Sequence, residues 1–196
     1  MKKLMIPIIC MTVITACNNK TESSTTTETG DSSLDNSKRE QLKDAAAEME
    51  TKKDELLNLT PYSTDQMNAL IPKDLLGAAA TDVEITPTMG TSLANATYKV
   101  DDSTEIEISI IDCAGAAGSG IYNMQYLSMF GFEEEDEDEY TKTIDFNGGK
   151  AFENCKKNKP DCTLTYLSGG RFLVTMEGEN VGIEKLKELA KGMNVR

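Results

Sequence analysis

Residues 105–110 alternate strictly between polar and apolar side chains. The apolar positions are Ile106, Ile108 and Ile110, and the polar positions between them are Glu105, Glu107 and Ser109. Successive side chains of a β-strand point to opposite faces of its sheet, so this strand buries one face and exposes the other. A strand of a parallel sheet, covered on both faces, would be apolar throughout. The pattern therefore predicts an antiparallel sheet with one face in contact with water.

Similar patterns elsewhere predict further strands and the helices that cover the sheet. Turn sequences rich in Asp, Ser, Asn and Gly separate the strands as hairpins, at residues 101–103, 147–149 and 168–170. The expected strands are residues 83–86, 95–100, 104–111, 140–146, 150–155, 162–167 and 171–177, and the expected helices are residues 63–70, 121–132 and 180–192. Residues 61–196 are thus predicted to form one α+β domain, an antiparallel β-sheet with helices packed on its faces.

The N-terminus has the pattern of an export signal. Two lysines precede an apolar run at residues 4–14, and Thr15, Ala16 and Cys17 follow. The run is too short for a membrane-spanning helix, which needs about 20 apolar residues. These residues resemble the bacterial lipoprotein signal peptide, whose lipobox ends in a small residue before an invariant cysteine. The resemblance implies that residues 1–16 are removed and that Cys17 is lipidated and anchors the protein to the bilayer; ordinary signal cleavage is the alternative.

Residues 17–36 are predicted to be a flexible tether. Beyond Cys17 they are dominated by Ser and Thr, and Leu34 is the one large apolar side chain among them, so the stretch cannot bury enough surface to fold. As a flexible coil it would span roughly 24 Å, enough to hold a domain clear of a bilayer. Disordered filler with no tethering role is the alternative.

Residues 37–60 are predicted to form an amphipathic helix or spacer. Ser37 and Glu40 have the spacing of a capping box. Leu42, Met49 and Leu56 recur every seven residues, but a pair of lysines interrupts this apolar stripe. Because three interrupted heptads are weak support for a coiled coil, we favour a solvated spacer over a helix that binds a partner.

The chain contains no histidine and no tryptophan. The absence of histidine excludes a Ser-His-Asp triad, a Cys-His pair, a His-ligated zinc site and His-ligated haem. Without residues 1–16 the chain keeps 18 of its 20 basic residues against 33 acidic residues, a formal charge of −15. Such a charge repels nucleic acid and anionic lipid headgroups, so nucleic acid is not an expected partner.

Residues 113–120, Cys-Ala-Gly-Ala-Ala-Gly-Ser-Gly, lie between the alternating strand and an apolar segment. A strand, a Gly-rich turn and a helix in this order can hold a phosphate on backbone amides. However, Ala117 occupies the second glycine position of the dinucleotide-binding pattern, and no Gly-Lys-Ser/Thr follows. We therefore interpret the segment as a loop whose small residues let helix and sheet approach closely.

The expected helix at residues 121–132 is apolar on nearly every side. A helix of this kind is usually buried in a core. One of its stripes, formed by Tyr122, Tyr126 and Met129, is alternatively an apolar cleft, because flexible Met and Tyr side chains adapt to a small ligand.

Seven consecutive carboxylates follow that helix: Glu133, Glu134, Glu135, Asp136, Glu137, Asp138 and Glu139. Hard cations prefer oxygen ligands, so this acidic run is a candidate for weak Ca²⁺ binding. It lacks the alternating acidic residues and the turn-forming glycine of an EF-hand loop. A solvated, self-repelling loop is therefore the favoured interpretation, and no other cofactor is expected.

Three cysteines remain once Cys10 leaves with the signal and Cys17 carries lipid. Cys155 and Cys162 bracket a turn-rich loop that would place them opposite each other in a hairpin. An exported protein meets oxidising conditions, so a disulfide is expected, whereas a metal site would need further ligands. Cys113 is expected to be a buried small apolar residue, because no histidine is present to activate it.

Short motifs spread over residues 70–196 carry a further resemblance. They are Ile108-Ser109-Ile110-Ile111-Asp112 with the Ala/Gly segment, Asp138-Glu139-Tyr140, Phe146-Asn147-Gly148, Arg171-Phe172-Leu173-Val174 with Glu177-Gly178, and Leu186-Lys187. In these motifs the chain is similar to a group of uncharacterised exported bacterial proteins whose fold is PsbP-like, an α+β sandwich. The resemblance implies an antiparallel sheet with helices against its faces and supplies no catalytic residues.

We therefore expect a non-catalytic binding or accessory module anchored in the bacterial cell envelope. Its expected partner is another envelope protein; the choice of membrane, periplasmic or surface exposure, and the oligomeric state stay open. Two alternatives remain. One is a carrier of a divalent cation or a small apolar ligand. The other is an envelope hydrolase using a carboxylate pair. With 33 acidic residues in the chain, the sequence does not identify which two would form this pair.

Overall fold

The computed structural model describes residues 36–88 and 90–196, with the backbone alone at residues 36–42 and 88. The predicted signal peptide, the lipidation site Cys17 and all but the last residue of the predicted tether therefore lie outside the described residues, as do the side chains of the predicted capping box at Ser37 and Glu40. The described residues belong to one compact unit. Among the helices of this part of the chain, none is long and apolar enough to cross a membrane.

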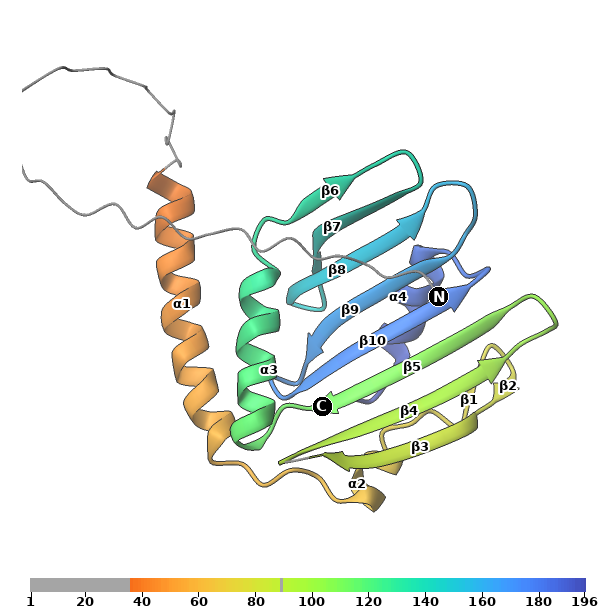
Figure 1. Cartoon of the computed structure of the whole chain (residues 1–196), viewed down its shortest axis with the longest axis horizontal. Coiled ribbons are helices and arrows are strands. Elements are labelled where there is room, and N and C mark those ends of the chain that lie inside the picture. The colour runs from red at the N-terminus through yellow and green to blue at the C-terminus, as the bar shows by residue number, and fades with distance from the viewer. Residues whose placement is uncertain (1–35, 89) are drawn as a thin grey trace, which may run out of the picture. The chain divides into compact units, whose positions relative to one another are not determined.

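The helices and strands follow one another as shown in Figure 1. Their order is α1 (Asn36–Leu57), α2 (Thr64–Asn68), β1 (Asp74–Leu75), β2 (Ala78–Ala79), β3 (Thr81–Thr88), β4 (Thr91–Lys99), β5 (Glu105–Asp112), α3 (Gly115–Ser128), β6 (Glu133–Glu135), β7 (Glu139–Phe146), β8 (Gly149–Lys156), β9 (Cys162–Ser168), β10 (Phe172–Glu179) and α4 (Ile183–Gly192). The predicted strands and hairpins all appear, with bounds shifted by a few residues. Ser63 caps α2 and forms a capping box with Gln66.

Eight of the strands form one antiparallel sheet in the order β3-β4-β5-β10-β9-β8-β7-β6, and β1 pairs with β2 in a separate small hairpin. Neighbouring strands in the sheet are mostly consecutive in sequence, because hairpin turns connect them. The exception is the pairing of β5 with β10 near the middle of the sheet, which brings together segments from distant parts of the chain. The predicted class, α+β with an antiparallel sheet, is confirmed.

One face of this sheet carries the main hydrophobic core. Helix α4, which lies behind the sheet in Figure 1, covers this face together with α2 and the β1–β2 hairpin. Ile106, Ile108 and Ile110 of β5 are at most 1% exposed there, and they pack in the same core as Leu186 of α4. The buried side of the alternating strand is therefore the side that its isoleucines predict.

The opposite face is covered only at one end. Helix α3 packs there in a second apolar cluster that includes Tyr122, Cys113 at the end of β5 and Leu173 of β10. Beyond this cluster the same face presents polar side chains, and no helix of the described residues covers them (Figure 1). We call this uncovered part the open face.

Helix α1 packs against α3 and joins the domain. The sequence favours a solvated spacer here and places the domain boundary at residue 61. Instead, Leu56 is 1% exposed beside Tyr122, and Ala45 is also buried. Met49 and Lys52 are half-buried between them, so the four residues form one stripe along the helix. The lysine does not prevent this stripe from packing, because its apolar stem can lie against the neighbouring surface.

Helix α3 begins at Gly115, within the segment that we interpret as a loop. The expected reason for its small residues still applies, because a Cβ atom on Gly118 would lie 2.4 Å from the carbonyl carbon of Cys113. The first turns of α3 can therefore sit against the end of β5 only with glycine at this position.

Candidate binding surface on the open face of the sheet

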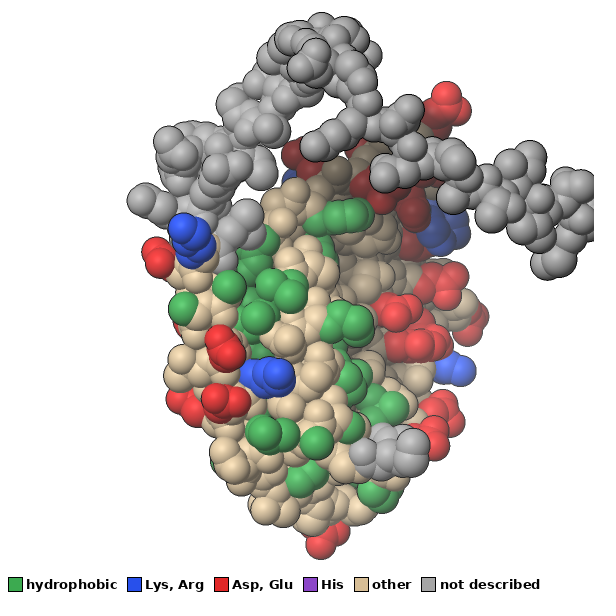
Figure 2. All heavy atoms as spheres, turned by 60° about the vertical axis from the view of Figure 1, so that its left-hand side comes forward, with side chains coloured by type: hydrophobic (Ala, Val, Ile, Leu, Met, Phe, Trp, Pro, Cys, Tyr) green, Lys and Arg blue, Asp and Glu red, His purple; other side chains and the backbone are tan. Residues whose placement is uncertain are grey.

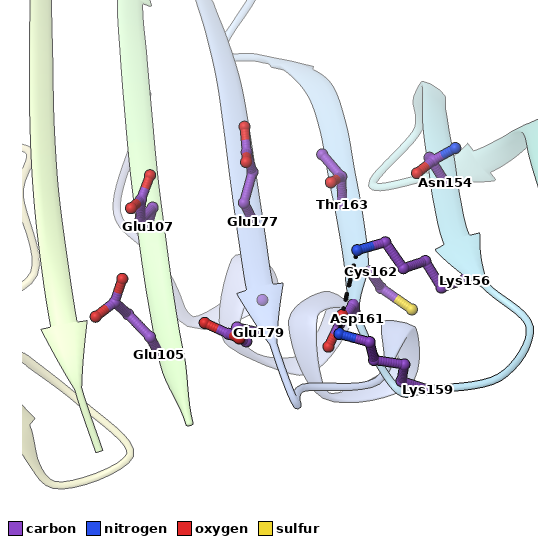
Figure 3. A pocket seen from close by; sticks show the side chains of 11 residues that line it. Glu105, Glu107, Asn154, Lys156, Lys159, Asp161, Cys162, Thr163, Glu177 and Glu179 are labelled. Carbon is purple, nitrogen blue, oxygen red and sulfur yellow. Dashed lines mark hydrogen bonds and ion pairs between the residues drawn. The ribbon is translucent and has the colours of Figure 1, made fainter. Parts of the chain in front are cut away.

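Two pairs of glutamates face each other across the junction of β5 and β10. Glu107 lies directly opposite Glu177, and Glu105 lies directly opposite Glu179. Figure 3 shows the four side chains on the same side of the two strands. Like charges directly opposite each other destabilise a pair of strands. The sheet thus carries an unfavourable charge arrangement where its strands are otherwise in regular register.

Small polar side chains surround these glutamates. In the row of Glu107 and Glu177, the register adds Thr97 of β4, Thr163 of β9 and Asn154 of β8. The next row towards α3 contains Asn95, Ser109, Thr175 and Thr165, and it continues in β8 with Phe152. The open face is therefore a flat area of hydroxyl, amide and carboxylate groups, suited to hydrogen bonding and to positive charge.

A shallow hollow of about 300 Å³ lies over this area, between the four glutamates and the loop that joins β8 to β9. Lys156 at the end of β8 and Lys159 of this loop reach the hollow (Figure 3). Both are paired with Asp161: Lys156 Nζ lies 3.4 Å and Lys159 Nζ 3.0 Å from its carboxylate. On the other side, Lys99 Nζ is 3.8 Å from Glu105. In the described part of the chain, the other three glutamates of the hollow take part in no ion pair.

Asp161 pairs with the two lysines in its ionised form, which its surroundings strongly favour. The backbone N–H of Asn180 donates a hydrogen bond of 2.9 Å to its carboxylate, and Lys159 donates another. Together these contacts lower the pKa of Asp161 to about 2. This single carboxylate balances the charge of only one of the two lysines. The hollow stays negative because five acidic side chains line it against two lysines. Acidic side chains gather towards the right in Figure 2, where this face is turned.

The acidic run, Glu133 to Glu139, forms a hairpin rather than the expected loop. Its first three residues are β6, an exposed edge strand paired with β7. Asp136 turns the chain, because its Oδ1 accepts hydrogen bonds from the backbone N–H groups of Asp138 and Glu139. Glu135 forms an ion pair of 2.6 Å with Lys157.

These carboxylates do not converge on a common point. Among the residues that the structure describes, no group of three or more acidic, Cys or His side chains is placed to hold a metal ion. Weak Ca²⁺ binding by the acidic run stays a prediction.

The cysteines lie as the sequence predicts. Cys155 of β8 and Cys162 of β9 are directly opposite each other and form a disulfide, with their Cα atoms 4.2 Å apart. Cys113 is a free thiol with no exposed surface. Burial raises its pKa to about 12, which keeps it a thiol rather than a nucleophilic thiolate.

The third predicted set is the stripe of Tyr122, Tyr126 and Met129, which lies in the second half of α3 and directly after it. Tyr122 and Met129 are buried and Tyr126 is half-buried, and all three line a cavity separate from the hollow over the glutamates. The stripe is therefore mostly buried, as the favoured interpretation expects, and in the structure it also lies beside a cavity. Binding of an apolar ligand there stays a prediction.

Sequence reasoning identified Glu105 and Glu107 as solvent-facing but missed Glu177 and Glu179 as their partners. The alternation of Thr175, Glu177 and Glu179 was a usable signal, because it places acidic residues on one side of a strand. The pairing of β5 with β10 was not predictable from local pattern.

No protein-family model matches this chain, and no curated protein and no solved structure is significantly similar to it.

Proposed function

We propose that this protein is a lipid-anchored binding module of the bacterial cell envelope, and that its open face engages a cationic, Lys- or Arg-rich segment of another envelope protein. The observation that carries the proposal is the double row of opposed glutamates on an uncovered face. Two opposed carboxylates cost stability in the free protein, and a cation placed between them would remove that cost. Charge complementarity of this kind gives an interface its specificity and speeds association.

The surroundings of the glutamates support a protein partner more than a single ion. The hollow is wide and shallow, and rows of Thr, Ser and Asn side chains flank the carboxylates. An extended segment lying across the strands would meet these hydrogen-bonding groups between its positive side chains. The predicted anchor at Cys17 would restrict the search for such a partner to the membrane surface.

The finer fold assignment is part of the same proposal. An antiparallel sheet with a helix-covered core on one face is compatible with the PsbP-like resemblance. The lipobox-like end of the N-terminal segment supports export and lipidation, and a non-enzymatic role agrees with the lack of histidine.

Site-specific photo-crosslinking in cells tests the proposal. A photoreactive amino acid replaces Thr175, which lies in the row beside the glutamates, and adducts are compared in Glu107→Gln/Glu177→Gln and Cys17→Ala backgrounds. We expect an adduct with one protein that weakens in both backgrounds and with rising salt, because exposed charge pairs are screened by salt. The matched control is Glu134→Gln/Glu137→Gln, which removes the same charge from the acidic run.

Stability measurements separate loss of binding from loss of folding. Replacing one glutamate of an opposed pair should raise the free energy of unfolding by about 0.2–1 kcal/mol, because the repulsion disappears. A variant that is more stable and binds less would show a charge arrangement maintained for recognition. An adduct that is insensitive to the charge of the open face would count against the proposal.

The cation-carrier alternative keeps a simple test. Binding of Ca²⁺ to the native state must raise the melting temperature, and the increase must grow as the logarithm of one plus the ratio of the Ca²⁺ concentration to Kd. An unchanged melting temperature up to millimolar Ca²⁺ would rule out the cation carrier. The hydrolase alternative would need two carboxylates whose surroundings push their pKa values apart. The absence of activity on ester, glycoside and peptide substrates would rule this alternative out.

A further inference from the structure

A cavity of about 700 Å³ lies between α1, α3 and the turns that join β7 to β8 and β9 to β10. Helix α3 contributes Tyr122 and Tyr126 to its lining, and α1 contributes Glu48. Met129 and Phe130, which follow α3 directly, also line it. We call this cavity the aromatic groove. Its volume is within the range of about 300–1,000 Å³ that is typical of small-molecule sites. A neighbouring hollow of about 410 Å³ shares both tyrosines and Glu48.

The aromatic rings of the groove form a continuous series along α3. The rings of Tyr122 and Tyr126 are nearly parallel, with centroids 6.0 Å apart and an interplanar angle of 12°. Phe130 meets Tyr126 edge-on, at 5.1 Å. Hydrophobic side chains are visible along the side of the molecule that Figure 2 brings forward, the side of α1 and α3. Ring faces of this kind attract cations through their quadrupole.

The charges at the groove leave one carboxylate without a basic partner. Lys150 is paired with Asp145 at 2.6 Å, and Lys52 is paired with Glu55 at 2.7 Å. Glu48 takes part in none of the ion pairs formed within residues 43–196 of the described chain; it accepts a hydrogen bond of 3.3 Å from Tyr126 Oη.

The two phenols beside Glu48 add no charge of their own. Burial, followed by the influence of Tyr126, raises the pKa of Tyr122 to about 12. Burial and the negative charge of Glu48 also raise the pKa of Tyr126. Both rings therefore stay neutral and electron-rich at neutral pH, next to a carboxylate.

We propose that the aromatic groove binds a small organic cation, a molecule with an apolar body and an ammonium group. The body packs against the rings of Tyr122, Tyr126 and Phe130, and the ammonium group lies between the Tyr126 ring and the Glu48 carboxylate. This site is independent of the proposed function, because it uses other residues and takes a small molecule instead of a protein segment. It gives the carrier alternative a ligand class that differs from both a metal ion and a purely apolar molecule.

The test compares three probes that share a benzyl body and differ in charge: benzyltrimethylammonium, neutral benzyl methyl sulfone and anionic benzylsulfonate. Binding to the full-length protein is measured by calorimetry and by ligand-observed NMR. We expect the cation to bind at least about tenfold more tightly than the neutral probe, since a desolvated cation–π contact and a carboxylate both favour it. The anion should not bind.

Variants of the groove then locate the bound cation. Glu48→Gln and Tyr126→Leu should each weaken binding of benzyltrimethylammonium about tenfold, whereas Tyr126→Phe keeps the ring and should keep the affinity. Glu50→Gln is the matched control for charge on the same helix, and Met124→Ala is the control on the outer face of α3, where Met124 is 69% exposed. Neither control should change the affinity.

Three results would overturn the inference. They are equal affinity for the cation and the neutral probe, an unchanged affinity in Glu48→Gln, and an affinity lost in Glu107→Gln/Glu177→Gln, which would move the bound cation to the open face. Because Glu48→Gln changes an exposed side chain, the test survives even if Tyr126→Leu fails to fold. If the aromatic groove binds no cation, the crosslinking result at the open face is unaffected. The two proposals are therefore tested separately.

Discussion

The guanidinium of Arg171 forms a two-pronged ion pair with the buried carboxylate of Asp112. Arg171 Nε lies 2.8 Å from Oδ1 of Asp112, and Nη2 lies 2.9 Å from Oδ2. Nη2 also donates to the carbonyl of Thr60, while the backbone N–H of Tyr62 donates to Asp112 at 2.6 Å. The pair therefore ties the segment between α1 and α2 to the end of β5 and the start of β10. Through this segment it helps to hold α1 at its place beside the groove.

Loss of this ion pair should destabilise the fold strongly. Asp112 has no exposed surface. Asp112→Ala therefore leaves the half-buried guanidinium of Arg171 without its partner, and the free energy of unfolding should fall by about 3–5 kcal/mol. Urea denaturation measures the change. The control is Asp145→Ala, which breaks the exposed pair with Lys150 and should cost less than about 1 kcal/mol. Equal effects of the two substitutions would contradict the structural role of Asp112.

Gly118 and Gly120 should respond in opposite directions to a methyl group. A Cβ on Gly118 meets the Cys113 backbone, so Gly118→Ala must displace α3 or β5 and should cost about 1–3 kcal/mol or more. A Cβ on Gly120 meets nothing within 4 Å, and Gly120→Ala should stabilise the helix by about 0.4–1 kcal/mol. Thermal unfolding of the two variants makes the comparison, and a neutral Gly118→Ala would show that the helix has room to shift.

Reduction of the disulfide between Cys155 and Cys162 should weaken the protein measurably. Closing so short a loop is worth about 2.5 kcal/mol in the chain-entropy model. Denaturation with and without a reducing agent should therefore differ by about this amount. In the double variant Cys155→Ser/Cys162→Ser the reducing agent should have no effect. If that variant still responds to the reducing agent, another thiol reaction is responsible.

Stability should fall at acid pH as two carboxylates lose their charge. Burial opposes ionisation of Glu153, but its ion pairs with Lys187 and Lys142 outweigh this effect and lower its pKa. The pKa of Asp161 is lowered to about 2. A carboxyl group with a lowered folded-state pKa stabilises the fold above its unfolded pKa and loses this contribution as pH falls through the folded value. The loss should thus begin near pH 4.5, the ordinary Glu value, and continue towards pH 2.

A substitution separates the part of this effect that belongs to Glu153. Glu153→Gln should lower stability at pH 7, where Lys187 would lose its 2.7 Å partner. The gap between this variant and the original protein should narrow as the pH is lowered, because the original then loses the same charge. Denaturant midpoints measured from pH 7 to pH 2 provide the test. A gap that stays constant would mean that Glu153 is not ionised in the folded protein.

Local sequence patterns predicted most of the strands and hairpins. The alternation around Ile108 identified both the buried and the solvated side of β5, since side chains alternate with a period of two whatever the strand's partners are. Asn-Gly at residue 147 predicted the β7–β8 turn, where Asn147 adopts a positive φ of 53°. The short spacing between Cys155 and Cys162 predicted their disulfide for the same reason: all the information lies within one hairpin.

Other elements depended on contacts that no local pattern contains. The lysines in the stripe of α1 argued against packing, yet Leu56 and Ala45 find a complementary surface on α3. The small residues at the start of α3 suggested a loop, but they form the first turns of the helix, which approach the Cys113 backbone closely at Gly118. In the acidic run, Asp136 supplied a turn that repulsion between neighbouring carboxylates did not prevent.

The sequence by itself determined the α+β class, the solvated side of the alternating strand, the disulfide and the acidic character of the surface, because these follow from periodicity, turn chemistry and charge within short stretches. Only the tertiary structure decided that Glu107 meets Glu177 and that Glu48 meets Tyr126. The first contact requires β5 to pair with β10 in one register, and the second requires α1 to pack on α3. Both proposed sites arise from such long-range packing, in which segments are chosen by shape and burial over the whole chain.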